Sequence, residues 1–471
     1  MKTHNIKIKK GLDVPLPGLP ERHTTDLRSM DLYAVKPADV VGFTPRLSVA
    51  EGDTVCAGQP LVVDKRDPRL FLPSPVSGTV HAIVRGEKRK LLEVIVGTQR
   101  AASAENDSPM RTQRAASEKN DSPMRTQRAA SLQESPVWWM LRQRPFGTIA
   151  DPDAKPKAIV VSLRDTNPLA PDLTLALRGR EHEFEAGVKA LEAYAEVHCV
   201  KAEGPHPAGN VGTQIAALCP ISKGECVWTV NAQDVANIGR WMLTGEYRPE
   251  RLVAVGGPAA KAPHYYRLTV GACLKRITDV QLMDTCYPSL TSSASESSPT
   301  RIISGSPLSG TTVAPDGFLG MYDQQLCLIP EGDQYEFMGW LMPGLKKFSF
   351  SKTFFSGLAE PIMSLKPVQA LTSFMSLDSQ KPSYTFNTNL HGSVRPFLFT
   401  GSFERVFPFD IYPLQLIKAC IVGDVELQEQ LGIYEVEPED FALCEFIDPS
   451  KTEIQTIIRE ALEVLRKEAT A

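Results

Sequence analysis

The chain has 471 residues, enough for roughly three or four domains of ordinary size. With 42% hydrophobic and 23% charged residues, its composition is that of a folded protein rather than a disordered one. The 51 basic and 55 acidic residues give a formal net charge of −4 and are mixed along the chain. The concentrated basic face that a nucleic-acid partner normally needs is therefore not expected.

Membrane spans, secretory signals and metal clusters are not expected either. No run approaches the ~18 apolar residues of a membrane span, and the basic stretch "MKTHNIKIKKGLDV" is not followed by the apolar segment of a secretory signal. The nine cysteines form no CxxC pair, and the two nearest are Cys219 and Cys226, so no zinc site or iron–sulfur cluster is predicted. We interpret the cysteines as small buried residues of a protein in a reducing cytoplasm.

Short β-branched runs alternate with Gly, Asp and Pro turns over residues 40–97, which predicts several short strands. "VAEGDTVCAGQPL" and "SPVSGTVHAIVRGE" share one strand–turn–strand plan. This plan resembles the biotinyl/lipoyl barrel-sandwich fold, in whose carrier domains a hairpin lysine bears the cofactor. Lys65 in "VVDKRDP" stands near that place. Because its charged flanks differ from the Met-Lys-Met type of carrier lysines, we interpret Lys65 as a surface turn residue.

A near-perfect tandem repeat of 14 residues follows the barrel-like segment. "TQRAASAENDSPMR" is succeeded by "TQRAASEKNDSPMR" and by a third "TQRAAS". The repeat is nearly free of large apolar side chains, so burial cannot offset its conformational entropy. We therefore predict a disordered insertion at residues 98–131, in a surface loop where added length costs little.

The next unit is expected to be a Rossmann-like αβ domain. Trp138 and Trp139 lie in a predicted short amphipathic helix, with one ring facing the core and the other facing a neighbouring domain or subunit. Apolar runs then alternate with segments of helical spacing. Four strands are predicted, at "KAIVVSL", "VHCVKA", "ECVWTV" and "ERLVAVGG". Asn231 is the predicted N-cap of the helix after the third strand, and Gly245 is its predicted end.

The remainder is predicted to be a small β-rich domain followed by helices. The last helix is predicted to begin at Ser450, with Glu453 completing a capping box. One face of that helix is apolar, and we interpret it as a packing face. The residues of this face are Ile454, Ile457, Ile458, Ala461, Leu462 and Leu465. The expected units of the whole chain are residues 1–97 (with a barrel-sandwich core at about 38–97), 98–131, 132–258, 259–400 and 401–471.

The stretch "GPHPAGNVGT" follows the second predicted strand of the αβ unit. Glycines in such a loop let backbone N–H groups converge on a phosphate. Here Gly204, Gly209 and Gly212 are five and three residues apart, which does not match GxGxxG, and no Gly-Lys-Ser/Thr follows. Two prolines also remove donor N–H groups. We interpret the loop as a turn that opens a helix, and nucleotide binding is the weaker alternative.

No catalytic constellation is visible in the sequence. The eight histidines form no HExxH, and no GxSxG nucleophile elbow occurs. Asp410 in "RVFPFDIYP" is interpreted as a helix cap or turn anchor rather than a catalytic residue. The residues therefore predict a multi-domain scaffold of enzyme-like modules, with no catalytic residue and no metal ligand.

Seven segments, in order and from end to end, closely resemble the A subunits of bacterial sodium-translocating NADH:quinone reductases. They are "IKIKKGLDVPLPGLPE", "SPVSGTVHAIVRGEKRKLLEVIV", "DTNPLAPD", "GPHPAGNVGT", "SGSPLSG", "FERVFPFDIYPLQLIKACIVGD" and "LGIYEVEPEDFALCEFIDPSK". The repeat at residues 98–131 departs from the family pattern. The resemblance implies a peripheral subunit on the cytoplasmic face of the inner membrane, in a six-subunit complex that uses NADH, flavins, iron centres and quinone to pump Na⁺.

The resemblance also implies an architecture similar to the flavin-bearing NADH subunit of respiratory complex I. That relative has a glycine-rich flavin loop, a Rossmann-like domain, a β-grasp domain that binds soluble ligands, and a helical domain with a cysteine-ligated cluster. The flavin loop corresponds to Gly204–Thr213, where Gly204, Gly209, Gly212 and Thr213 form a degenerate version. The helical domain keeps only Cys420 and Cys444, too few for a four-cysteine cluster. We therefore expect a chain that binds no cofactor of its own.

Three hypotheses follow from this sequence. The first is a cofactor-free scaffold that docks on the membrane-embedded B subunit near the quinone-reducing end. The second is a direct quinone-binding module, with the stretch Phe403–Tyr412 or the surface around Trp138 as the candidate pocket. The third is a stand-alone biotin- or lipoyl-type carrier that uses Lys65. The candidate docking segments are residues 4–14, the Trp138–Trp139 pair and Phe348–Gly357.

Overall fold

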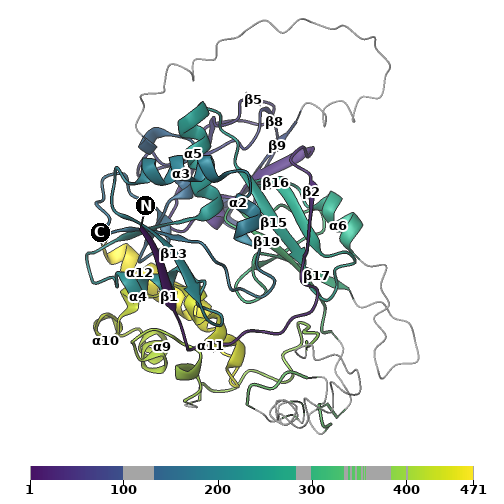
Figure 1. Ribbon diagram of the computed structural model, residues 1–471, viewed down its shortest axis with the longest axis vertical. Coiled ribbons are helices and arrows are strands. Elements are labelled where there is room, and N and C mark those ends of the chain that lie inside the picture. The colour runs from purple at the N-terminus through teal and green to yellow at the C-terminus, as the bar shows by residue number, and fades with distance from the viewer. Residues whose placement is uncertain are drawn as a thin grey trace, which may run out of the picture.

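The computed structural model describes residues 2–98, 132–282, 299–333, 383–398 and 401–469, together with residues 338–339, 342–344, 347–351, 354 and 356. Apart from Thr98, the predicted repeat insertion lies outside the described residues. Most of the Ser-rich stretch "TSSASESSPT" (residues 291–300) and part of Phe348–Gly357 also lie outside them. The described chain is a mixed α/β structure with four sheets and a group of C-terminal helices (Figure 1).

A six-stranded sheet in the order β1-β13-β12-β14-β10-β11 forms the first αβ unit. Its first four strands are parallel, and β10 and β11 are antiparallel. The strands are β1 (Lys2–Lys7), β10 (Arg142–Arg144), β11 (Thr148–Ile149), β12 (Ile159–Ser162), β13 (Val197–Glu203) and β14 (Val227–Asn231). The helices are α2 (Leu173–Leu177), α3 (Glu181–Leu191), α4 (Val211–Leu218) and α5 (Ala232–Thr244).

Helices cover both faces of this sheet, as expected for parallel strands with continuous apolar runs. Ile159 and Val161 of β12 belong to the core that includes α3 and α5, while Val160 packs in a second cluster with Ile215 of α4. The predicted caps of α5 are confirmed. The Asn231 side chain accepts the N–H of Asp234, and Gly245 ends the helix in the left-handed conformation.

The second six-stranded sheet has the order β18-β17-β19-β15-β16-β2. Its strands are β2 (Glu21–Asp26), β15 (Glu250–Gly256), β16 (His264–Thr269), β17 (Thr300–Ser304), β18 (Thr311–Val313) and β19 (Gln325–Pro330), and α6 (Lys275–Gln281) packs beside them. The strand "ERLVAVGG" was expected in the first sheet, and this was wrong. It is β15, buried at every position between β16 and β19. A continuous apolar run fits the centre of either sheet, so periodicity alone could not choose.

Two small sheets, β3-β9-β8-β5 and β4-β6-β7, form the N-terminal barrel-like unit. The strands are β3 (Leu32–Val35), β4 (Pro45–Leu47), β5 (Thr54–Val55), β6 (Pro60–Asp64), β7 (Phe71–Pro73), β8 (Gly78–Arg85) and β9 (Leu91–Gly97). Lys65 follows β6 directly, in the connection to β7, and its side chain is exposed.

Four α-helices close the described chain: α9 (Pro413–Val422), α10 (Val425–Gln430), α11 (Ala442–Ile447) and α12 (Ile454–Ala469) (Figure 1, yellow-green to yellow). The apolar face of α12 is buried as predicted, except that Ile457 is only half-buried. The predicted start at Ser450 was wrong by four residues. The Ser450 hydroxyl instead accepts the N–H of Leu398, and the Ser450 N–H donates to Asp448.

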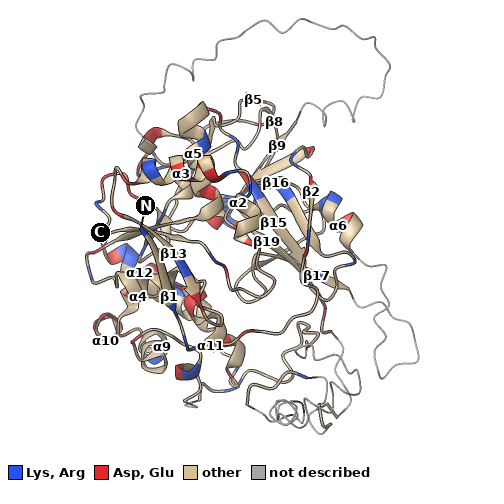
Figure 2. Cartoon of the chain, in the orientation of Figure 1, with Lys and Arg blue, Asp and Glu red and all other residues tan. Residues whose placement is uncertain are grey.

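The N-terminal segment connects sheets that lie far from it in sequence. β1 pairs in parallel with β13 of the first sheet, and β2 pairs in parallel with β16 of the second. Leu12 and Val14, between these strands, pack against the C-terminal helical core. Charged residues of both signs are interspersed over the elements rather than gathered on one of them (Figure 2). Within the described ranges, no helix has both the length and the apolar character to cross a bilayer.

Both tryptophans of the expected amphipathic helix are buried, and the segment is a single 3₁₀ turn over Trp138–Met140. The α-helix expectation was therefore wrong. Trp138 packs against Trp228 of the first sheet, while the Trp139 ring faces Tyr322, beside the second sheet. The two rings face different partners, as expected, but both partners belong to this chain.

Candidate functional site

The glycine-rich loop joins the end of β13 to the start of α4. It therefore lies at the carboxyl end of the parallel strands, which is where open α/β sheets bind ligands. Of the four residues singled out in the sequence, Gly204 begins the loop, Gly209 precedes the N-cap of α4, and Gly212 and Thr213 lie in its first turn. Thr213 is 2% exposed.

The space beside each glycine of this loop is filled by the protein itself. A Cβ at Gly204 would overlap the carbonyl oxygen of Ile8, which follows β1. A Cβ at Gly209 would overlap the backbone of Thr166, after β12. A Cβ at Gly212 would overlap the carboxylate of Asp440, which comes from the group of C-terminal helices. The absence of side chains at these glycines therefore allows three other segments of this chain to pack against the loop, in the space that a ligand would need.

Four N–H donors of the loop, at residues 206 and 208–210, are also used within the chain. The His206 N–H donates to Asp13 Oδ1 over 3.0 Å, and the Gly209 N–H donates to Thr166 Oγ1 over 2.8 Å. The N–H groups of residues 208 and 210 donate to carbonyls inside the loop. A bound phosphate needs several converging donors to be free. The N–H groups of Val211 and Gly212 have no acceptor among the described residues, but with the other four donors used the loop does not fit the phosphate of a flavin nucleotide.

A buried cluster of charges connects the loop to the group of C-terminal helices. Arg144 of β10, 1% exposed, donates to Asp440 over 2.9 Å and to Glu439 over 3.0 Å, and Glu437 lies 3.3 Å away. Burial opposes the charge of Arg144, but the three carboxylates outweigh it and raise its pKa. Burial raises the pKa of Asp440 to about 6, against the opposing effect of Arg144 and with a contribution from Glu439.

Asp440 supplies the negative charge that the N-terminus of α4 attracts. A phosphate at the same place would face the carboxylates of Asp440 and Glu439. At 4 Å and an effective dielectric constant of about 20, each such repulsion is worth about 4 kcal/mol. The electrostatics of the site therefore disfavour an anionic ligand as clearly as its geometry does.

Several buried polar atoms around the loop have no hydrogen-bond partner in the described part of the chain: His206 Nε2, Thr213 Oγ1, Gln214 Oε1 and Asp440 Oδ1. Burial lowers the pKa of His206 to about 4, so its ring is neutral near pH 7. His206 Nδ1 lies 3.3 Å from the Thr166 hydroxyl. Among the described residues, no three His, Cys, Asp or Glu side chains are grouped so that they could hold a metal ion.

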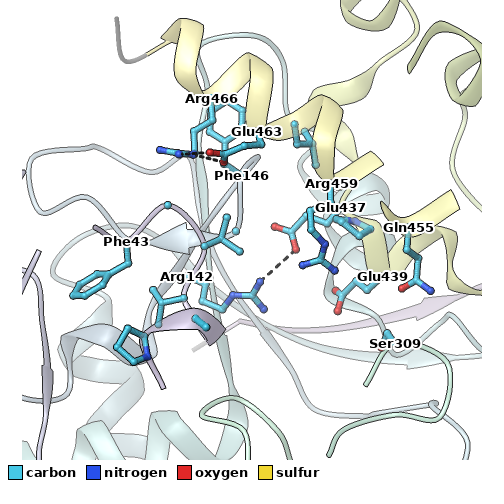
Figure 3. A pocket seen from close by; sticks show the side chains of 18 of the residues that line it. Phe43, Arg142, Phe146, Ser309, Glu437, Glu439, Gln455, Arg459, Glu463 and Arg466 are labelled. Atoms are coloured by element: carbon cyan, nitrogen blue, oxygen red, sulfur yellow. Dashed lines mark hydrogen bonds and ion pairs between the residues drawn. The ribbon is translucent and has the colours of Figure 1, made fainter. Parts of the chain in front are cut away.

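A cavity of about 580 Å³ lies beside the charged cluster (Figure 3). Its walls come from the barrel-like unit, the β10–β11 connection and α12, and they include Phe43, Arg142, Phe146, Arg459 and Leu462. Arg142 points toward Glu437, 3.6 Å away, and its guanidinium lies over the ring of Tyr322. The volume lies within the usual range for small-molecule pockets. The walls combine apolar residues with eight charged ones, namely Lys90, Arg142, Asp323, Glu437, Glu439, Arg459, Glu463 and Arg466.

The pocket candidates chosen from the sequence lie elsewhere. Phe403, Phe407 and Phe409 are 1–3% exposed in the core of the helical domain, so the stretch Phe403–Tyr412 offers no open slot. Asp410 is exposed, and Tyr412 rather than Asp410 holds the N-cap position of α9, so the cap interpretation was wrong. The Trp138 ring, 3% exposed, lines no surface.

The arginines and acids of this site were missed in the sequence, although a signal was present. Arg142 and Arg144 are two positions apart on a strand and therefore face the same side. Glu437, Glu439 and Asp440 fall within "VEPED", which is acidic in a chain of mixed charge. Cys420 and Cys444 lie on α9 and α11, and burial raises the pKa of both thiols.

Three family models match consecutive parts of the chain. They are described as the NqrA N-terminal barrel-sandwich hybrid domain (residues 6–99), the NqrA second alpha/beta domain (residues 124–247) and the NQRA C-terminal domain (residues 252–314). The first confirms the barrel-sandwich fold expected for the N-terminal unit. One solved structure, an NAD⁺-reducing NiFe hydrogenase in the air-oxidized state, aligns over 44% of this chain and 47% of its own at 12% identity and a TM-score of 0.30, which supports no inference.

Curated relatives match over nearly the whole chain. The A subunit of the Na(+)-translocating NADH-quinone reductase of Rhodopirellula baltica is 36% identical, with 98% of both chains covered. The A subunits of the same enzyme from Neisseria meningitidis serogroup B and from Pasteurella multocida are each 34% identical, covering 98% of this chain and 100% of theirs. The chain therefore belongs to the family of A subunits of Na⁺-translocating NADH-quinone reductases.

Proposed function

We propose that this chain is a scaffold component of a sodium-translocating NADH:quinone reductase and binds no redox cofactor itself. The observation that carries the proposal is the filled loop, where Ile8, Thr166 and Asp440 occupy the space beside three glycines. The NADH, flavins, iron centres and quinone used by the complex would then be held by its other five subunits.

The chain is proposed to sit peripherally on the cytoplasmic face of the bacterial inner membrane and to dock chiefly on the membrane-embedded B subunit, near the quinone-reducing end. A persistent assembly of this kind usually buries more than about 2,000 Å². The Trp138–Trp139 pair is buried in this chain and is no longer a docking candidate. Lys7, Lys9 and Lys10 of the N-terminal candidate segment are exposed.

The test is the purified full-length chain. We expect it to be colourless, to contain no stoichiometric flavin or iron, and to oxidise no NADH, while a tagged copy co-purifies with the B subunit from cells that express both. A stoichiometric flavin that survives gel filtration would contradict the cofactor-free part. Failure to co-purify would contradict the docking part.

Direct quinone binding is the alternative that one observation favours, namely the 580 Å³ cavity bounded by Phe43, Phe146 and Leu462. Titration with a short-chain quinone should quench tryptophan fluorescence saturably if this alternative is right. Leu462→Trp would fill the cavity and abolish quenching, whereas Val464→Trp, on the exposed face of the same helix, would not. Non-saturable quenching, or equal quenching of both variants, would eliminate the alternative.

The carrier alternative depends on Lys65, whose exposed position after β6 is compatible with modification. Intact mass spectrometry of the chain from its native host decides it, because a biotinyl or lipoyl group adds a fixed mass. We expect the unmodified mass.

We also propose that the first sheet with α2–α5 is a Rossmann-like domain and that the second sheet belongs to a β-grasp domain. Because β15 pairs with β16 and β19, we place the boundary between these two domains before Glu250 rather than at residue 258. The other proposed boundaries, at residues 97, 131 and 400, are kept. Limited proteolysis followed by mass spectrometry should release fragments that end near these positions.

A further inference from the structure

A second, smaller cavity of about 190 Å³ lies at the carboxyl ends of β12 and β14. Ser162 ends one of these strands and Asn231 ends the other, and the first turn of α4 completes the wall. Because β13 and β14 lie on opposite sides of β12, the chain connections leave this end of the sheet in opposite directions. This is the position at which open α/β sheets bind ligands.

The carboxamide of Asn210, in the wall of this cavity, has no hydrogen-bond partner among the described residues. Asn210 is 8% exposed and occupies the N-cap position of α4, yet its side chain makes no capping hydrogen bond. Asn231, at the same position of α5, does cap its helix, with Oδ1 accepting the N–H of Asp234 over 2.9 Å. Within the described chain, the N–H groups of Val211 and Gly212 also have no acceptor. A buried carboxamide and two helix N–H groups are therefore free to bind a ligand.

The charges around the cavity disfavour ligands of either sign. An anion would approach the carboxyl groups of Asp165 and Glu439 in the wall, with Asp440 against Gly212 behind them. A cation would meet the guanidinium of Arg142 and the N–H donors at the start of α4, which offer it no lone pair. A neutral molecule that both donates and accepts hydrogen bonds meets neither penalty.

Size and lining narrow the class of ligand further. At roughly 30 Å³ per water molecule, the volume corresponds to about six waters, which is room for one small ring system but not for a dinucleotide. Leu173, Val230 and Tyr322 provide apolar wall, and the Asn210 and Gln324 carboxamides and the Thr229 hydroxyl provide polar groups. We propose that this cavity binds an uncharged nucleobase, either free or as the base of a nucleoside whose sugar lies outside the cavity, and that its carboxylates exclude the phosphorylated forms.

The first test is calorimetric titration of the full-length chain with adenosine and with uridine, each compared with its 5′-monophosphate. We expect saturable binding of at least one nucleoside, and at least tenfold weaker binding of the matching monophosphate. Asn210→Ala should weaken nucleoside binding at least tenfold, because it removes an unpartnered buried carboxamide. Asn5→Ala, the same change at an exposed position of β1, should leave binding unchanged.

Absence of binding by both nucleosides at millimolar concentration would overturn the proposal, as would equal binding of the monophosphate. A variant that binds a ligand more tightly provides a further test, because a misfolded protein would not gain affinity. Asp165→Asn removes one carboxylate from the wall and should raise affinity for the monophosphate at least threefold while affinity for the nucleoside changes little. Unchanged monophosphate affinity would contradict the proposed role of the carboxylates.

Discussion

Two fully buried arginine–aspartate pairs occur among the described residues, and they are built differently. Arg251 of β15 contacts both oxygens of Asp234 from α5 at 2.7 Å, and the neighbouring residues Asn231 and Asn237 donate to the same carboxylate. Arg144 contacts one oxygen of Asp440, and the other oxygen of Asp440 has no partner among the described residues.

The difference lies in the ratio of acids to bases as well as in the hydrogen bonds. Asp234 is the carboxylate paired with Arg251, whereas Arg144 is shared by Asp440, Glu439 and Glu437. Removing one partner of a matched buried pair leaves an uncompensated charge. Removing one acid from an acid-rich cluster leaves a cluster that is better balanced. Equal burial therefore does not imply equal contribution to stability.

The largest expected effect comes from Asp234→Asn. The change leaves Arg251 buried without a carboxylate partner, so we expect the free energy of unfolding to fall by about 3–5 kcal/mol. Chemical unfolding followed by tryptophan fluorescence measures it. The matched control is Asp440→Asn, for which we expect a loss of less than about 1 kcal/mol, because Glu437 and Glu439 remain beside Arg144. Similar losses of unfolding free energy in the two variants would contradict the proposed difference between the two buried pairs.

Gly212→Ala probes the crowding around Asp440 directly. Alanine normally favours a helix over glycine by about 1 kcal/mol, but here its Cβ would overlap the Asp440 carboxylate. We expect a net loss of about 1–3 kcal/mol, the usual cost of overpacking. In an Asp440→Ala background the same change should become neutral or stabilising. If Gly212→Ala costs as much in both backgrounds, Asp440 is not what fills the space.

The pH dependence of stability should distinguish the two pairs through Asp440. Its pKa is about 6 in the folded chain and near 3.8 when unfolded, so the folded state binds the proton more tightly over this interval. Its contribution to the free energy of unfolding therefore rises as pH falls through 6 and levels off below about 4. Relative to Asp440→Asn, the wild-type chain should gain about 1–2 kcal/mol between pH 7.5 and pH 5. A constant difference across this range would show that Asp440 stays ionised.

The smallest effect is expected at an exposed ion pair. Lys223, after α4, lies 2.7 Å from Glu429 of α10 and connects the first αβ unit to the helical domain across solvent. Lys223→Ala should lower the free energy of unfolding by less than about 1 kcal/mol, because water and salt screen such pairs. A loss above about 2 kcal/mol would mean that domain contact depends on surface charge as well as on the buried cluster.

Features encoded locally were predictable from the sequence. The caps Asn231 and Gly245 depend on residues within one turn of α5, and the apolar face of α12 depends only on its own spacing. Where a distant segment competed for a local group, prediction was wrong. Ser450 was expected to cap α12, but its hydroxyl instead accepts the N–H of Leu398 across a tertiary contact.

Only one part of the candidate site, the glycine-rich loop, could be predicted from the local sequence. The spacing of glycines and prolines indicated a loop poor in free donors. The contact between Arg144 and Asp440, the residue beside Gly212, was not predictable. The two residues are 296 positions apart, and neither segment has a pattern that indicates the other. The two cavities were not predictable either, because their walls come from several units of the fold that are far apart in the sequence.

The two N-terminal strands have a consequence for how the chain is made. The hydrogen-bonded pair His4 and His198, from β1 and β13, is separated by 194 positions, and Thr25 of β2 contacts His264 of β16 across 239. At roughly 5–20 residues per second, a ribosome needs roughly 10–40 s to supply the partner of β1. Until β13 is made, the backbone N–H and C=O groups of β1 lack the strand with which they pair in the folded protein. We therefore expect β1 of a growing chain to be open to pairing with another chain, because an unpaired strand favours association.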